Sequence, residues 1–187
     1  VGVFDTGARR AVLAAPPFGR CDAAMLLACA EAAEAAGAAE LRLSPWRAIA
    51  ILDLSPDAAQ ALARRLAAAG FILAPDDPRL FVTACPGAPA CGRGEVATVA
   101  DAARLVREQP GLPGPGRSIH LSGCVKSCAR PGPAALTLVG SGGLYDVVIA
   151  GGTRDAAVAR LDFSALMRRL AAGGDLHARL EATLDPA

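Results

Sequence analysis

The sequence predicts an α+β fold in two parts, and three observations support this. Short apolar, strand-like runs alternate with alanine-rich helical runs over residues 10–70. The segment Asp76-Asp77-Pro78 then has the composition of a linker. Beyond it, two strand-like runs each lead directly into a pair of cysteines. We therefore expect a first domain at residues 1–75 and a second domain of mixed α and β structure at residues 76–187.

The first part is expected to fold in the order β-α-β-β-α. Pro16 and Pro17 end the first strand, and Gly37 is a stop signal for the helix that follows. The next two strands differ, because one alternates polar and apolar residues and the other is continuously apolar and β-branched. Ser55 is a favourable N-cap for the last helix, with Pro56 at its first position. These elements are expected at 10–15, 21–36, 40–43, 48–52 and 56–69.

The second part is expected to combine strands with helices. The run Ser141-Gly142-Gly143 is typical of a hairpin turn, so the strands on either side of it should pair. Pro110 ends the first helix, and Gly173-Gly174 separates the last two. Strands are expected at 80–83, 118–121, 134–139 and 144–150, and helices at 95–108, 163–172 and 176–184.

Composition excludes several classes of protein. The 187 residues carry 19 Lys+Arg against 18 Asp+Glu, so the net charge of +1 argues against a polybasic surface for nucleic acid. No apolar run reaches the ~18 residues that a membrane span requires. The first residues have neither the basic start nor the apolar region of a signal peptide. We therefore expect a cytoplasmic protein with no nucleic-acid or membrane partner.

Four of the six cysteines form two close pairs. Cys85 and Cys91 have the spacing C-x5-C, and Cys124 and Cys128 have the spacing C-x3-C. Four thiolates are what a [4Fe–4S] cluster needs, and the small residues of both loops would let backbone N–H groups approach the sulfurs. Structural zinc is an alternative that fits the x3 pair but not the x5 pair. Two disulfides are a further alternative, which an exported protein would favour.

The two remaining cysteines are expected to have another role. Cys21 and Cys29 lie eight residues apart on the expected apolar helix. Such thiols behave as small hydrophobic side chains, so both are expected in the core. Trp46, the only tryptophan, is also expected in the core.

The cysteine pattern resembles the nitrite/sulfite reductase superfamily. The resemblance rests on the two spacings, on Pro86-Gly87 after the first cysteine and on Ser122-Gly123 before the third. Softer motifs are most similar to members that act on a precorrin in aerobic cobalamin biosynthesis. These motifs lie at 17–20, 42–47 and 122–131.

The resemblance implies a fold and a set of cofactors. It implies a ferredoxin-like half-domain at 1–75, followed by an iron–sulfur/sirohaem α/β domain at 76–187. The four paired cysteines would hold a [4Fe–4S] cluster. A second iron centre is implied as well, either a mononuclear iron or a sirohaem whose iron Cys128 would bridge to the cluster. Superfamily members carry this unit twice, so the chain is expected to be a C-terminal half that works with an N-terminal repeat.

The resemblance also implies an activity. The chain would belong to an iron–sulfur monooxygenase that converts precorrin-3A to precorrin-3B with O2 and a reduced electron donor. One alternative is a sirohaem-dependent sulfite or nitrite reductase. Another is a ferredoxin-like electron-transfer module without a substrate site of its own.

Several basic residues are candidates for contact with this carboxylate-rich tetrapyrrole. Lys126 lies inside the second cysteine loop and Arg130 just beyond it, so either could meet a carboxylate or influence the cluster. Both could equally be solvated loop charges. By their positions in the softer motifs, three arginines of the first part are substrate-binding candidates: Arg20, Arg42 and Arg47.

Overall fold

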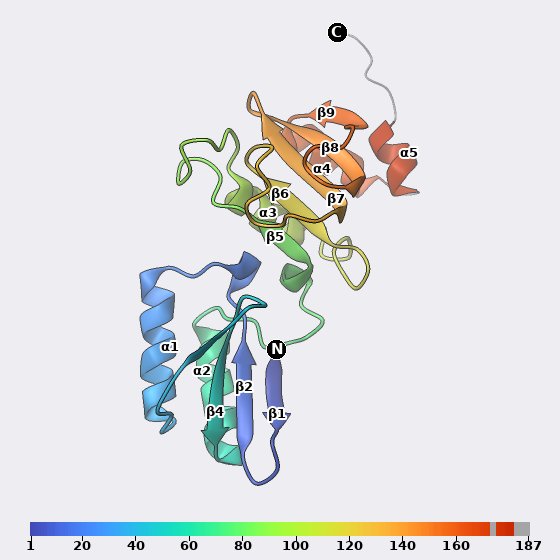
Figure 1. Ribbon diagram of the computed structural model, residues 1–187. Coiled ribbons are helices and arrows are strands. Elements are labelled where there is room, and N and C mark those ends of the chain that lie inside the picture. The colour runs from blue at the N-terminus through green and yellow to red at the C-terminus, as the bar shows by residue number, and fades with distance from the viewer. Residues whose placement is uncertain (173–174, 182–187) are drawn as a thin grey trace. The chain divides into compact units, whose positions relative to one another are not determined.

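The computed structural model describes residues 1–172 and 175–181. The chain forms two compact units, Val1–Leu80 and Phe81–Ala187, each with its own sheet (Figure 1). The expected linker at 76–78 lies just before this division. The expected separation at Gly173-Gly174 and the last three residues of the expected 176–184 helix lie outside the described residues.

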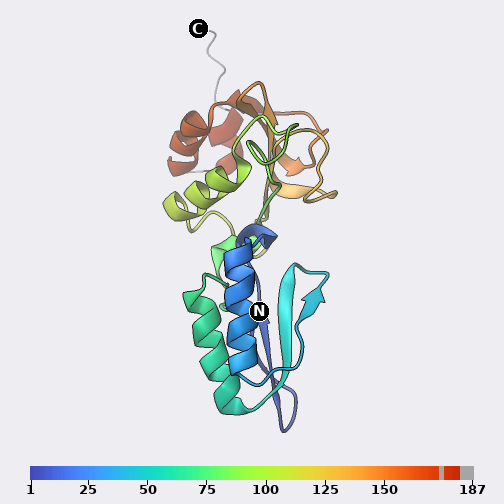
Figure 2. The same cartoon turned by 90° about the vertical axis from the view of Figure 1, so that its left-hand side faces the viewer.

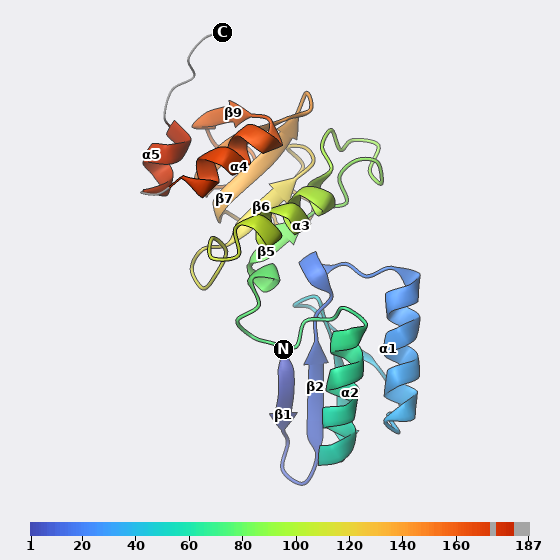
Figure 3. The same ribbon diagram turned by 180° about the vertical axis from the view of Figure 1, so that it is seen from behind.

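The first unit is a four-stranded antiparallel sheet with two helices. The strand order is β1-β2-β4-β3, and both helices pack on the same face of the sheet (Figures 2 and 3). Val12, Ile51 and Leu62 are among the residues buried between the sheet and the helices. The elements are β1 (Gly2–Asp5), β2 (Arg10–Ala14), α1 (Ala23–Ala35), β3 (Arg42–Ser44), β4 (Ala48–Leu54) and α2 (Pro56–Ala68).

Side-chain caps fix where both helices begin. The Ser55 hydroxyl accepts a hydrogen bond from the Ala58 N–H at 3.2 Å, as the sequence predicts. The Asp22 carboxylate accepts from the Met25 N–H at 2.8 Å. Because Asp22 is the cap, α1 begins at Ala23 rather than at the expected Cys21.

The second unit is a five-stranded mixed sheet in sequential order, β5-β6-β7-β8-β9. The pairs β5·β6 and β6·β7 are parallel, and the remaining pairs are antiparallel. Helices α3 and α4 lie on the same face of this sheet (Figure 3). The elements are β5 (Val82–Ala84), α3 (Thr98–Glu108), β6 (Ile119–Ser122), β7 (Ala134–Ser141), β8 (Leu144–Gly151), β9 (Ala159–Leu161), α4 (Phe163–Ala171) and α5 (Leu176–Glu181).

The α+β prediction is confirmed, and the hairpin between β7 and β8 forms as expected. The expected helix at 95–108 begins later, at Thr98. Residues 95–97 instead belong to the loop network, in which the Glu95 N–H donates to the Gly123 carbonyl and the Val96 carbonyl accepts from the Ala88 N–H. Tertiary hydrogen bonds therefore replace the first helical turn.

No helix within the described ranges is long and apolar enough to cross a membrane.

Candidate functional site

The two cysteine loops leave the sheet side by side. Strands β5 and β6 are parallel neighbours, so their carboxyl ends lie at the same edge. Cys85 follows β5 directly, and Cys124 lies two residues after the end of β6. The Cys85 N–H donates to the Leu121 carbonyl at 3.1 Å, which continues the pairing one step beyond β5. The topology therefore brings the first loop, 85–97, against the start of the second, 123–133.

Cys85 is the most enclosed thiol of the four. Its side chain is 8% exposed, and its Sγ accepts a hydrogen bond from the Gly123 N–H at 3.0 Å. Cys91 and Cys124 are half-buried and Cys128 is exposed. All six cysteines of the chain are free thiols, so the disulfide alternative is not observed. A backbone N–H directed at a cysteine sulfur is the kind of contact that stabilises a metal-bound thiolate.

Glycines allow the loop backbones to approach this closely. A Cβ at Gly123 would lie 3.1 Å from Gly94 Cα and 3.4 Å from Cys85 Sγ. A Cβ at Gly94 would lie only 2.7 Å from the Gly87 carbonyl carbon. A side chain at Gly123 would therefore push the two loops apart, and one at Gly94 would push apart two segments of the first loop.

The sulfurs of Cys85, Cys91, Cys124 and Cys128 do not converge on a metal-binding group in the described structure. Within residues 1–172 and 175–181, no three His, Cys, Asp or Glu side chains are placed to hold a metal ion. The structure joins the two loops and gives Cys85 an N–H partner, while Cys128 faces solvent. The assignment of Cys85, Cys91, Cys124 and Cys128 as cluster ligands therefore remains a prediction, whose chemistry fits four free thiols on two adjoining loops.

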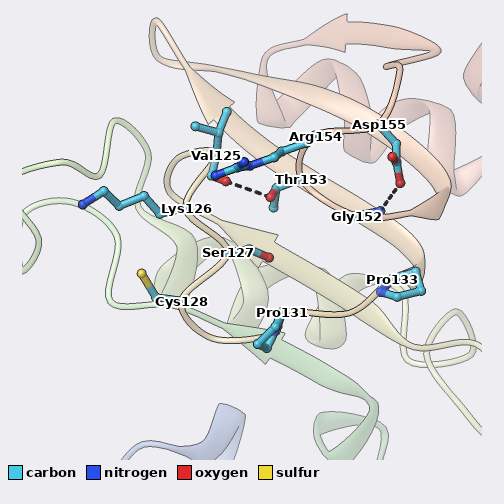
Figure 4. A pocket seen from close by; sticks show the side chains of 10 residues that line it. All are labelled: Val125, Lys126, Ser127, Cys128, Pro131, Pro133, Gly152, Thr153, Arg154 and Asp155. Carbon is cyan, nitrogen blue, oxygen red and sulfur yellow. Dashed lines mark hydrogen bonds between the residues drawn. The ribbon is translucent and has the colours of Figure 1, made fainter.

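The second cysteine loop also forms one wall of a pocket of about 570 Å³ (Figure 4). Thr153, in the turn after β8, donates from its hydroxyl to the Val125 carbonyl at 2.9 Å and ties the two walls together. Asp155 accepts from the Gly152 N–H at 2.8 Å, which fixes the turn itself. The pocket is lined by Val125, Lys126, Ser127, Cys128, Pro131, Pro133, Gly152, Thr153, Arg154 and Asp155.

The two candidate cations of this loop have different surroundings. Lys126 lines the pocket, beside the exposed Cys128. Arg130 instead braces its own loop, because its Nε donates to the Pro133 carbonyl at 2.9 Å. Its carbonyl accepts from the Ser127 hydroxyl at 2.5 Å. Arg154, which no sequence motif singled out, supplies a second cation to the pocket lining.

The three arginine candidates of the first unit lie on or near its β2 and β3–β4 segments. The Arg47 side chain packs over Gly19, the residue before Arg20, so these two arginines lie at the same end of the sheet. Arg42 forms an ion pair with Glu40, with Nε 2.6 Å from the Glu40 Oε1.

The expectation of a buried Trp46 is wrong, since its side chain is 85% exposed in the tight turn between β3 and β4.

The two lone cysteines, Cys21 and Cys29, differ in burial. Cys29 is fully buried in the core of the first unit, and burial raises the pKa of its thiol. Cys21 is exposed, contrary to expectation, because it precedes the Asp22 cap and so lies outside the helix.

A hydrogen bond between two polar side chains, only one of them fully buried, joins α3 to β8. The Tyr145 hydroxyl of β8 donates to Asp101 of α3 at 2.7 Å. Burial raises the pKa of Tyr145 and that of Asp101, so the phenol stays protonated across the physiological range. This bond attaches α3 to the sheet and holds the beginning of the helix next to Cys85.

The first unit matches a known domain. Residues 5–69 match the family described as the nitrite/sulfite reductase ferredoxin-like half domain. The chain is also 38% identical, over 160 residues and 85% of its length, to a precorrin-3B synthase of Sinorhizobium sp., of which it covers 35%. Residues 5–69 therefore form a nitrite/sulfite reductase ferredoxin-like half domain, and the chain as a whole is similar to a precorrin-3B synthase.

Other known proteins are also similar to the chain. A sulfite reductase [ferredoxin] 2 of Mycolicibacterium paratuberculosis is 33% identical over 137 residues, which cover 70% of this chain and 25% of that protein. The fold matches the NirA protein of Mycobacterium tuberculosis with a TM-score of 0.69 at 22% identity, over 95% of this chain and 39% of NirA. Dissimilatory sulfite reductase I matches with a TM-score of 0.53 at 15% identity, over 70% and 32% of the two chains. The chain thus spans about a third or less of the curated relatives it matches.

Proposed function

We propose that the chain is the cluster-bearing part of an oxidoreductase that converts precorrin-3A to precorrin-3B in corrin-ring biosynthesis. The observation that carries this proposal is the 38% identity to a precorrin-3B synthase over 85% of the chain. The matched region spans both units, because 160 aligned residues are more than either unit contains. We further propose that an N-terminal repeat completes the enzyme as its partner.

The proposed cofactor is a [4Fe–4S] cluster held by Cys85, Cys91, Cys124 and Cys128. Two features of the chain support it: all four thiols are free, and the Gly123 N–H already faces the Cys85 sulfur. When bound, the cluster supplies single-electron transfer. To bind the cluster, the side chains of Cys91, Cys124 and Cys128 must turn toward it. Cys91 and Cys124 are half-buried and Cys128 is exposed, so these side chains are not enclosed by the core.

The proposed reaction balances with one O2 and a two-electron donor. One oxygen atom adds to one carbon of a macrocycle double bond and becomes a hydroxyl group. A side-chain carboxyl group of the substrate adds through its oxygen to the other carbon and closes the lactone, and its proton is transferred to the new hydroxyl, so the substrate gains one oxygen atom overall. The other oxygen atom leaves as water after taking up two electrons and two protons from the donor. The chain's own residues would bind and orient the substrate, because a reaction centre needs its reactants held in fixed geometry.

Lys126 and Arg154 are the residues we propose for holding substrate carboxylates. Both line the pocket beside Cys128, and a charge-assisted hydrogen bond is stronger than a neutral one. Arg130 is less suited because one of its donors already serves the Pro133 carbonyl.

The change Lys126→Met or Arg154→Met should weaken binding of a polycarboxylate tetrapyrrole about tenfold. Methionine keeps an apolar stem of similar length and removes the charge. The measurement is the dissociation constant of uroporphyrin, a stable tetrapyrrole, followed by fluorescence. Arg168→Met is the matched control, since Arg168 is exposed on α4 and does not line the pocket. Equal weakening by all three variants would mean that binding reflects overall charge and not this pocket.

Turnover tests the proposed reaction itself. The reconstituted chain is supplied with precorrin-3A, O2 and a chemical reductant, alone and with the remaining part of a precorrin-3B synthase added. We expect a product that has gained one oxygen atom only in the mixture, because substrate binding needs groups from both repeats. Turnover by the chain alone would contradict the need for a partner repeat, and absence of product from a loaded, complete mixture would contradict the proposed reaction.

A sirohaem-dependent sulfite reductase is the second candidate. The 33% identity to a sulfite reductase over 70% of the chain favours it. Sulfide release from sulfite under the same reducing conditions, together with the sharp visible bands of a sirohaem, would select this candidate over the first.

A further inference from the structure

Thr98, the first residue of α3, contacts Cys85 from within the protein. Its side chain is fully buried, and it lies 13 residues after Cys85 in the chain. The Thr98 hydroxyl donates to the Cys85 carbonyl oxygen at 2.7 Å. The same oxygen, Oγ1, lies 3.8 Å from Cys85 Sγ. A single hydroxyl thus touches both the backbone and the sulfur of one cysteine.

Each polar group of Cys85 has a different partner. Its N–H donates to Leu121, its sulfur accepts from Gly123 and its carbonyl accepts from Thr98. The first two partners belong to β6 and the second cysteine loop, and only Thr98 comes from α3. Because a buried carbonyl without a partner is costly, the Thr98 hydroxyl is needed to keep this part of the backbone in place.

The surroundings leave little room for another arrangement. A Cβ at Gly87 would collide with Thr98 Oγ1 and would lie 2.8 Å from the Thr98 backbone nitrogen. The loop therefore turns directly against Thr98 before it continues to Cys91. Helix α3 is in turn attached to the sheet by the Asp101–Tyr145 hydrogen bond, so Thr98 is held on a fixed support.

We propose that Thr98 is a positioning residue that fixes Cys85 for cluster binding. It acts through Cys85 by holding the carbonyl, which limits how the cysteine backbone and its side chain can turn. This inference rests on the proposed function, because the cluster gives Cys85 its role. It also makes a prediction about the chain without a cluster: the Cys85 thiol should be protected from solvent as long as the Thr98 hydroxyl is present.

The test compares Thr98→Val, Thr98→Ser and Thr137→Val in the full chain without cluster. Valine keeps the shape of threonine and removes the hydroxyl, whereas serine keeps the hydroxyl. Thr137 is the matched control, because it is fully buried in the same unit and its hydroxyl donates to the Gly151 carbonyl at 2.6 Å, away from the cysteines. The measurement is the rate at which iodoacetamide alkylates each cysteine, read by mass spectrometry.

We expect Thr98→Val to raise the alkylation rate of Cys85 about tenfold, because loss of a buried hydrogen bond makes local opening of the loop easier. In Thr98→Ser and Thr137→Val, Cys85 should be alkylated at the same rate as in the unaltered chain. The exposed Cys128 should react equally fast in all four proteins. An unchanged Cys85 rate in Thr98→Val, or an equal rise in Thr137→Val, would overturn the proposal.

A second measurement uses the loaded chain. After anaerobic cluster reconstitution, Thr98→Val should lose its cluster in air several-fold faster than Thr98→Ser. If the unaltered chain loads no cluster, the proposed function fails, whereas the alkylation rates still decide whether Thr98 positions Cys85. If the cluster loads and the Cys85 rates are all equal, the Thr98 proposal fails and the proposed function stands.

Discussion

Replacing Cys124 or Cys128 by alanine is expected to abolish cluster loading, whereas replacing Cys21 or Cys29 leaves it unchanged. Each iron of the cluster needs a thiolate, so three ligands cannot complete the site. The two lone cysteines belong to the first unit, in which Cys29 is enclosed by the core and Cys21 precedes the cap of α1. The measurement is the iron and acid-labile sulfide content after reconstitution of each variant.

The controls separate loss of ligands from loss of folding. Cys29→Ala removes a fully buried sulfur and should lower the free energy of unfolding of the first unit by about 1 kcal/mol, without loss of iron. Cys128→Ala removes an exposed side chain, so it should unfold as the unaltered chain does and yet bind no cluster. Equal loss of iron from all four variants would show that the ligands are wrongly assigned.

Gly87→Ala is expected to destabilise the second unit by about 2–4 kcal/mol and to prevent cluster loading. Gly87 has φ +59°, where a Cβ is strained. The added carbon would also lie 2.6 Å from the Val96 carbonyl oxygen, and backbone at that position cannot move without disrupting both cysteine loops. The measurement is urea unfolding followed by the near-ultraviolet signal of Tyr145, the one tyrosine of the chain, which is buried in this unit.

Gly92→Ala is the matched control within the same loop. A Cβ at Gly92 would meet nothing within 4 Å, and its φ is not in the left-handed region. We expect its free energy of unfolding to stay within about 0.5 kcal/mol of the unaltered chain. If Gly87→Ala proved as stable as Gly92→Ala and loaded iron equally well, the close packing of the first cysteine loop against Val96 and Thr98 would not exist in solution.

Local signals in the sequence predict the elements with strong patterns. The β-branched run at 48–52 forms the central part of β4, Ser55 caps α2, and Ser141-Gly142-Gly143 joins the β7–β8 hairpin. Each of these signals acts between residues close in the chain. The sequence does not predict strands β1 and β9, because both are short and owe their conformation to pairing with β2 and β8.

The candidate site is predictable only in part, for a similar reason. Spacing alone indicates the four cysteines, and the order of the strands explains why their loops meet. Thr98 and Arg154 carry no motif, since they reach Cys85 and the pocket through contacts that span the fold. The Ala-rich run after Asp22 gives no sign that Cys21 lies outside the helix; the cap at Asp22 is the signal that could have placed it.

Anaerobic reconstitution of the 187-residue chain tests the central claim most directly. The claim is that Cys85, Cys91, Cys124 and Cys128 bind one [4Fe–4S] cluster. The measurement is iron and acid-labile sulfide per chain, together with the electron paramagnetic resonance spectrum after reduction. We expect about four irons and about four sulfides per chain and the spectrum of a reduced cubane cluster. A chain that binds a single zinc or iron ion without sulfide would contradict the claim.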